Sequence, residues 1–188
     1  RTTNRHDLSL KPPRKTMLDL LKDAGRDVIA VGKIFDIFDG EGVTEKIKTT
    51  GNTNGIAFTK ALQTRDFEGL AFVNLVDFDM LYGHRRDVAG YAAAATEFDK
   101  FVADFIPGMR EGDILMVTAD HGCDPSYTKT TDHTREYVPY LICGKSVKPG
   151  VDLGTRLCFG TIAQTICDYL GVDASTLDGK SVLGDILK

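Results

Sequence analysis

The chain has 188 residues, a length that fits one domain or slightly more. Its content of 42% hydrophobic and 27% charged residues is typical of a globular domain and excludes a disordered chain, a collagen and a coiled coil. The formal net charge of -4 provides no basic surface for nucleic acid or an anionic membrane, and the sequence has no run of about 18 apolar residues to span a bilayer.

The predicted elements alternate between helix and strand. In chain order they are a helix over 13–24, a strand over 27–31, a turn-rich connection over 34–42, a helix over 53–64, a buried strand over 69–76, a helix over 86–106, buried strands over 114–117 and 138–143, and a helix over 160–170. Pro13 suits a first helical turn and Gly25 suits a helix stop. This alternation predicts an α/β fold with helices on the faces of a sheet.

The cysteines and histidines carry different signals. The four cysteines form no C-x-x-C pair, so we expect a reducing, cytoplasmic setting rather than a disulfide scaffold. Three of the four histidines stand beside an aspartate in short polar segments. This clustering is the first indication of a functional site.

Polar loops follow two of the predicted buried strands. Asp79 and His84 come after the strand over 69–76, and Asp120 and His121 come after the strand over 114–117. His133 stands twelve residues after His121. Because sites in open α/β sheets lie beyond the carboxyl ends of strands, these loops are where a site is expected.

The residue types in these loops predict a metal centre. Carboxylate oxygen and imidazole nitrogen suit Mn²⁺ or Zn²⁺. Five ligands are too many for one tetrahedral catalytic site, which usually has three protein ligands and an open position. They therefore favour two metal ions, an arrangement that clamps the attacking and leaving oxygens of a phosphoryl group.

Each signal taken alone has a simpler interpretation. Asp77 or Asp79 would be an ordinary helix cap, and the Asp120–Gly122 stretch a polar turn. His133 alone would be a surface histidine, and we interpret His6 as ordinary. The metal hypothesis is favoured because three separate loops carry the same ligand chemistry at the expected positions.

Four strings of the sequence resemble the phosphopentomutases, a family of the alkaline phosphatase superfamily. They are DVIAVGKIFDIFDGEGVTE (27–45), NLVDFDMLYGHRRD (74–87), TADHGCDP (118–125) and TDHTREYVP (131–139). The TADHG string also fits cofactor-independent phosphoglycerate mutases, and the other motifs narrow the resemblance to the pentomutases. The resemblance covers nearly all of the chain.

The resemblance implies a specific ligand set. Asp79, His84 and His133 would hold one Mn²⁺ ion, and Asp120 and His121 the other. In the family the second ion has two further ligands, an early Asp and the Thr nucleophile. Neither has a counterpart in this sequence, so we expect no catalytic nucleophile in the chain.

The implied architecture is the carboxyl-terminal part of a doubly wound alkaline-phosphatase-like core, without its amino-terminal strands and its cap domain. Residues 1–12 would be the segment that returns from the cap, and residues 13–188 the metal-binding core. The start at Arg1 is then the expected break, and the missing amino-terminal part of the same protein is the expected partner.

The implied reaction interconverts α-D-ribose 1-phosphate, or its 2-deoxy form, and the 5-phosphate. A phosphorylated Thr passes its phosphoryl group to the sugar and regains one from the other position, and a sugar bisphosphate activates the enzyme. We expect these 188 residues alone to be inactive. Three alternatives stay open: a phosphatase or phosphodiesterase, a phosphoglycerate mutase, and a non-catalytic metal-binding module.

Several charged positions have more than one interpretation. Lys33 follows a strand and is a candidate contact for a substrate phosphate, as is Arg5; the alternative for Lys33 is a solvated loop lysine. For Arg85, Arg86 and Arg135 we favour pairing with neighbouring carboxylates. Cys123, Phe78 and Tyr82 are interpreted as packing residues.

Overall fold

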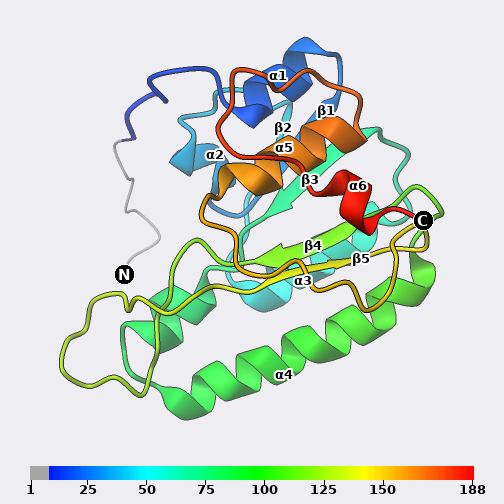
Figure 1. The fold of residues 1–188 in the computed structure, drawn as a ribbon. Helices are drawn as coiled ribbons and strands as arrows, with labels where there is room; N and C mark the ends of the chain where they lie inside the picture. Colours follow the sequence, from blue (N-terminus) through cyan, green and yellow to red (C-terminus); the bar gives the residue numbers. More distant parts are fainter. Residues whose placement is uncertain (1–8) are drawn as a thin grey trace. The chain divides into compact units, whose positions relative to one another are not determined.

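The computed structural model describes residues 9–188, which divide into two compact units. The first unit comprises residues 9–49, 65–74 and 152–185. The second comprises residues 50–64, 75–151 and 186–188. Segments of the two units therefore alternate along the chain (Figure 1).

A three-stranded parallel sheet forms the centre of the first unit. Its order is β2 (Glu45–Ile47), β1 (Asp27–Val31), β3 (Gly69–Val73), and β1 pairs with β3 from Asp27↔Gly69 to Val31↔Val73. Residues 28–31 of β1 are buried in succession, so both faces of this strand are covered. A continuous apolar run of this kind is typical of a central parallel strand.

Helices α1 (Met17–Asp23) and α5 (Gly160–Tyr169) lie side by side in the first unit (Figure 1). Their apolar side chains share one hydrophobic cluster with β1; the members from these three elements are Leu18, Leu21, Val28, Ala30 and Cys167. The Asp19 carboxylate caps α1, because it accepts hydrogen bonds from the Thr16 N–H at 2.7 Å and the Thr16 hydroxyl at 2.8 Å.

A bidentate ion pair joins β2 to the segment before β3. Both guanidinium Nη atoms of Arg65 donate to the Glu45 carboxylate, at 2.8 and 2.7 Å. These hydrogen bonds hold the pKa of Glu45 below its usual value. The short helix α2 (Ile34–Ile37) also belongs to the first unit. Helix α6 (Leu183–Ile186) lies at the boundary, with its first three residues in the first unit and Ile186 in the second.

The second unit contains an antiparallel pair of strands and two helices. Strand β4 (Leu115–Thr118) pairs with β5 (Tyr140–Cys143), with Leu115 opposite Cys143. Helix α3 (Asn52–Leu62) lies beside the long α4 (Val88–Phe105), which continues into the 3-10 turn Ile106–Gly108. Between the two helices, the Thr53 hydroxyl donates to Glu97 at 2.8 Å, and Gln63 Nε2 donates to the Phe105 carbonyl at 2.7 Å.

The predicted elements match the structure at most positions and differ at several. The helix expected over 13–24 begins only at Met17, because Thr16 is its N-cap, so Pro13 lies before the helix; α6 was not predicted. The strand expected over 69–76 ends at Val73, and the connection over 34–42 contains α2. Strands β3, β4 and β5, which were expected to be buried, are half-buried or exposed along their length. Strand β2 was not predicted. A π-helix, Phe78–Gly83, lies where a polar loop was expected after the strand. No helix in the described part of the chain has the length and apolar character needed to cross a membrane.

Candidate metal centre

A π-helix positions the first two predicted ligands. Its i→i+5 backbone hydrogen bond runs from the His84 N–H to the Asp79 carbonyl at 3.0 Å. This wide turn places two residues five apart on one face, and His84 Nε2 lies 3.1 Å from Asp79 Oδ1. Single π-helical turns are rare and occur often at functional sites. The D-x-x-x-x-H spacing is therefore a π-helical spacing.

A closed loop brings the other two histidines together. Gly122 and Thr134 form an isolated antiparallel bridge, with the Thr134 N–H bonded to the Gly122 carbonyl at 3.0 Å. The buried Thr134 hydroxyl accepts from the Asp124 N–H at 2.7 Å and donates to Glu136 at 2.5 Å. The rings of His121 and His133 consequently stack, with centroids 3.7 Å apart.

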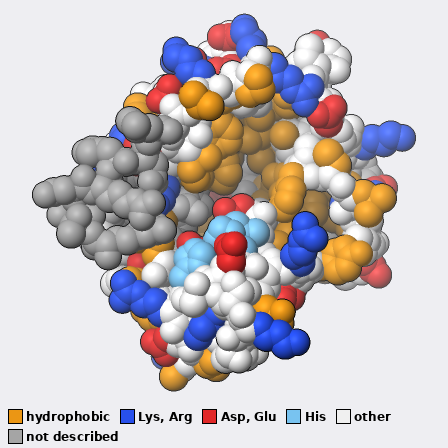
Figure 2. All heavy atoms as spheres, turned by 90° about the vertical axis from the view of Figure 1, so that its left-hand side faces the viewer, with side chains coloured by type: hydrophobic (Ala, Val, Ile, Leu, Met, Phe, Trp, Pro, Cys, Tyr) orange, Lys and Arg blue, Asp and Glu red, His pale blue; other side chains and the backbone are white. Residues whose placement is uncertain are grey.

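Asp79 lies at the centre of this histidine cluster. His133 Nε2 is 3.4 Å from Asp79 Oδ1, and the His84 and His133 ring centroids are 4.8 Å apart. One ligand atom each from Asp79, His121 and His133 lie within 4.8 Å of one another. Figure 2 shows histidine side chains gathered on one face with acidic side chains beside them.

The hydrogen bonds of the imidazoles select a tautomer. Nδ1 of His84 lies 2.5 Å from the Thr131 carbonyl, and Nδ1 of His121 lies 3.0 Å from the Gly122 carbonyl. A carbonyl only accepts, so Nδ1 of each ring carries a hydrogen, and Nε2 is the nitrogen left for a metal ion. This is how a metal-ligating histidine is usually oriented by its second nitrogen.

The donor set fits a divalent cation. Oδ1 of Asp79 is buried and accepts no hydrogen bond from the described residues. It lies 3.1 Å from Nε2 of His84 and 3.4 Å from Nε2 of His133, and a carboxylate oxygen and an imidazole nitrogen without a hydrogen repel each other at such distances unless a proton or a cation lies between them. Carboxylate and imidazole are the ligands that Mn²⁺ and Zn²⁺ accept, so the residues present suit the metal that the sequence predicts.

Asp120 is the predicted ligand that stands apart. Its side chain is 76% exposed, and its Oδ2 lies 3.6 Å from His121 Nε2. The structure thus brings together Asp79, His84, His121 and His133, and it places Asp120 next to His121. The division of these ligands between two ions stays a prediction.

Asp77 has a structural role. Its Oδ2 accepts from the N–H of Asn52, the first residue of α3, at 2.6 Å, and its own N–H donates to Asn52 Oδ1 at 2.9 Å. A carboxylate at this position satisfies a helix N-terminus. The cap interpretation therefore holds for Asp77, although the helix that it caps is α3 rather than the helical segment that follows it.

Cys123 belongs to the cluster although we interpreted it as a packing residue. Its Sγ lies with Asp79 and His84 in a second group of potential ligand atoms, all within 4.8 Å of one another. Burial raises the pKa of the Cys123 thiol, and the Asp79 carboxylate raises it further, while Arg86 opposes both effects. The only sequence signal was its place directly after the Asp-His-Gly triplet.

The two predicted phosphate contacts remain predictions. Lys33 is half-buried in the first unit, directly before α2, while the clustered ligands belong to the second unit. Arg5 lies outside the described residues, as does His6.

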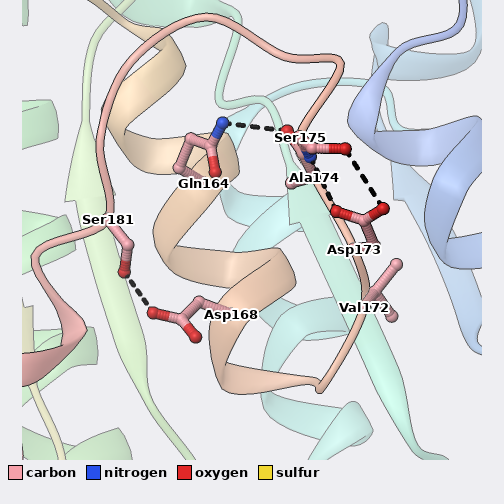
Figure 3. Close-up of a pocket in the computed structure, with 7 residues that line it drawn as sticks. All are labelled: Gln164, Asp168, Val172, Asp173, Ala174, Ser175 and Ser181. Atoms are coloured by element: carbon pink, nitrogen blue, oxygen red, sulfur yellow. Dashed lines mark hydrogen bonds between the residues drawn. The ribbon is translucent and has the colours of Figure 1, made fainter.

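The first unit has a hollow of its own, of about 380 Å³, beside α5 (Figure 3). Its polar groups bond to one another: Ser181 Oγ donates to Asp168 at 2.6 Å, and Gln164 Nε2 donates to the Ala174 carbonyl at 2.9 Å. Hydrogen bonds from Ser175 lower the pKa of Asp173. These contacts tie α5 to the segment that follows it.

Comparisons with known proteins agree with the ligand chemistry. A family model described as the metalloenzyme superfamily matches residues 1–174. The chain is 54% identical to a phosphopentomutase of Lachnoclostridium phytofermentans and 53% identical to one of Acetivibrio thermocellus, covering all of this chain and 48% of each relative. It therefore spans about half the length of the curated relatives that it matches.

A solved structure shows the fold. A phosphoglycerate mutase from Leishmania mexicana aligns with a TM-score of 0.68 at 17% identity, over 88% of this chain and 38% of that one. The predicted alkaline-phosphatase-like α/β fold is thereby confirmed.

Proposed function

The chain belongs to the metalloenzyme superfamily, and from this premise we propose that it is the metal-binding, carboxyl-terminal part of a phosphopentomutase. The observation that carries the proposal is the buried Asp79 Oδ1, which faces Nε2 of His84 and of His133 at 3.1 and 3.4 Å. Relatives named phosphopentomutase at about half identity over the whole chain support the choice of reaction.

The proposed reaction interconverts α-D-ribose 1-phosphate, or 2-deoxyribose 1-phosphate, and the 5-phosphate. Asp79, His84 and His133 hold one Mn²⁺ ion, and Asp120 and His121 hold the other. Bound there, the ions supply positive charge that neutralises the transferring phosphoryl group. The contribution of this chain is orientation, because the Thr131 and Gly122 carbonyls fix the rings of His84 and His121.

The remaining parts of the proposal lie outside the 188 residues. A Thr nucleophile and a further Asp ligand belong to an amino-terminal part, of the kind that makes up the other half of the relatives' length. A sugar bisphosphate primes the Thr. Lys33 and Arg5 contact substrate phosphates, and the enzyme acts in the cytoplasm.

The alternatives differ in products. A phosphatase or phosphodiesterase of the same superfamily releases phosphate without isomerising the sugar, and a phosphoglycerate mutase acts on phosphoglycerate. A non-catalytic module binds metal with closed coordination. The names of the relatives favour the pentomutase, since the mutase structure at 17% identity bears on the fold alone.

A chimera tests the proposed function. These 188 residues replace the matching segment of the Lachnoclostridium phytofermentans relative, which is 54% identical. With Mn²⁺ and a ribose bisphosphate primer, we expect the chimera to convert ribose 1-phosphate to ribose 5-phosphate. We expect the Asp79→Asn chimera to lose at least about 10²-fold in rate, while Asp77→Asn keeps most of the activity. The unaltered relative is the positive control.

Three results would overturn the proposal. They are phosphate release without ribose 5-phosphate, turnover of phosphoglycerate in place of the pentose, and a folded chimera without turnover. The 188-residue chain assayed alone should be inactive, because it has no nucleophile. Substantial turnover by this chain would contradict the assignment of the nucleophile to another segment.

A further inference from the structure

Cys123 extends the ligand chemistry of the cluster from oxygen and nitrogen to sulfur. Its Sγ lies in one group with a carboxylate oxygen of Asp79 and a ring nitrogen of His84. Asp79 also belongs to the group with His121 and His133. The Asp79 carboxylate therefore belongs to two groups of potential metal ligands, one that includes a thiol sulfur and one that has oxygen and nitrogen only.

The backbone around the thiol is shaped to admit it. Gly83 ends the π-helix, and a Cβ at this position would lie 2.5 Å from Cys123 Sγ, closer than any side chain tolerates. The Asp79 carboxylate raises the pKa of this thiol and the Arg86 guanidinium lowers it, so both charged groups act on the sulfur. Glycine thus lets the sulfur approach the turn that holds Asp79 and His84.

We propose that Asp79, His84 and Cys123 form a binding site for a thiophilic divalent cation, Zn²⁺ or Cd²⁺. The site shares two residues with the Mn²⁺ centre of the proposed function, but it does not depend on mutase activity. Thiolate ligands select soft and borderline ions, whereas Mn²⁺ prefers oxygen and imidazole. On binding, the Cys123 thiol proton leaves to solvent and the thiolate sulfur coordinates the ion. Because Asp79 serves both groups, the thiophilic ion competes with Mn²⁺.

Titration of the 188-residue chain with Cd²⁺ tests this site. We expect a cadmium–thiolate charge-transfer band that saturates at one ion per chain. Cys123→Ser should abolish the band and weaken Cd²⁺ binding by roughly 100-fold, since even partners that only orient a ligand are worth about 10- to 100-fold in metal affinity. Cys158→Ser, which removes an exposed thiol of the first unit, is the matched control and should keep the band.

A measurement on the unaltered chain avoids any folding defect of the variant. Cd²⁺ should slow alkylation of Cys123 but leave that of the exposed Cys158 unchanged, as read by mass spectrometry of each peptide. Equal alkylation of Cys123 with and without Cd²⁺, or a full band in folded Cys123→Ser, would overturn the proposal. The chimera assay tests a different proposal. If Cd²⁺ protects Cys123 from alkylation but the chimera has no mutase activity, only the proposed function is overturned.

Discussion

Arg86 ties the π-helical segment to the loop that carries the other histidines. Its Nε donates to the Thr130 carbonyl at 2.9 Å, Nη1 to the Asp124 carbonyl at 2.8 Å, and Nη2 to the Asp132 carbonyl at 2.7 Å. Its own backbone has a φ of 56°, a conformation that non-glycine residues adopt rarely. We expected Arg86 to have a structural role with carboxylate partners, and the structure supplies backbone carbonyls instead.

Replacement of Arg86 should therefore weaken metal binding without touching a ligand. Lysine has no planar fork that reaches three carbonyls at once, so we expect Arg86→Lys to lower Mn²⁺ affinity by about tenfold and stability by about 1–3 kcal/mol. Isothermal titration with Mn²⁺ and thermal unfolding measure the two effects. The adjacent, exposed Arg85→Lys is the control, and equal Mn²⁺ affinity in the two variants would disprove this role.

The sequence was sufficient to identify residues whose chemistry and position after a strand are both informative. Asp79 and His84 could be recognised as potential ligands in this way, and the structure places them in contact. Cys123 and Arg86 could not be assigned their roles, because these depend on the bridge between Gly122 and Thr134. Such pairing between irregular segments leaves no periodicity in a sequence.

The π-helix is the element on which the candidate centre depends most. It ends at Gly83, where any Cβ would collide with Cys123 Sγ at 2.5 Å and with the Phe78 carbonyl at 2.9 Å. Alanine here must push the 121–134 loop away or unwind the turn. Either change separates the carboxylate of Asp79 from the imidazoles that it contacts.

We accordingly expect Gly83→Ala to destabilise the protein by about 1–3 kcal/mol and to reduce Mn²⁺ affinity together with stability. The matched substitution is Gly112→Ala, where an added Cβ meets no atom within 4 Å. Urea unfolding with and without Mn²⁺ gives both quantities. Identical midpoints for the two variants would show that the close approach at Gly83 is not needed.

Elements with a long repeat were predicted better than short ones. Helices α3, α4 and α5 and strand β1 lie within a few residues of their predicted ranges. Helix α2 has four residues and β2 three, too few for a periodic pattern to distinguish them from a turn.

The division into two compact units separates the hydrophobic core from the candidate ligands. The hydrophobic core cluster found among the described residues belongs to the first unit, whereas Asp79, His84, His121 and His133 belong to the second. The sequence motifs that resemble the phosphopentomutases could not predict the division into two units, because each unit is assembled from segments that alternate along the chain. It depends on contacts between residues far apart in sequence.

Metal should consequently stabilise the two units unequally. A bound ion stabilises the state that binds it by RT ln(1 + [L]/Kd). Hydrogen exchange through local unfolding detects this stabilisation in the segments that carry the coordinating residues. We expect Mn²⁺ to slow hydrogen exchange over 78–84 and 121–134, with little change in β1, and chelation by EDTA to reverse the effect. His133→Ala should abolish it. Equal protection of β1 would contradict a centre confined to the second unit.

The hydrogen bond from His84 to Asp79 also has an evolutionary meaning. A π-helical turn holds one residue more than an α-helical turn, so its origin requires only the insertion of a single codon. Loss of that codon would return the pair to the i, i+4 spacing at which ordinary helices present two side chains on one face. The four residues between this aspartate and this histidine are therefore the number that a π-helical turn requires. Homologous genes with only three codons between the two should encode a regular helical turn at this point.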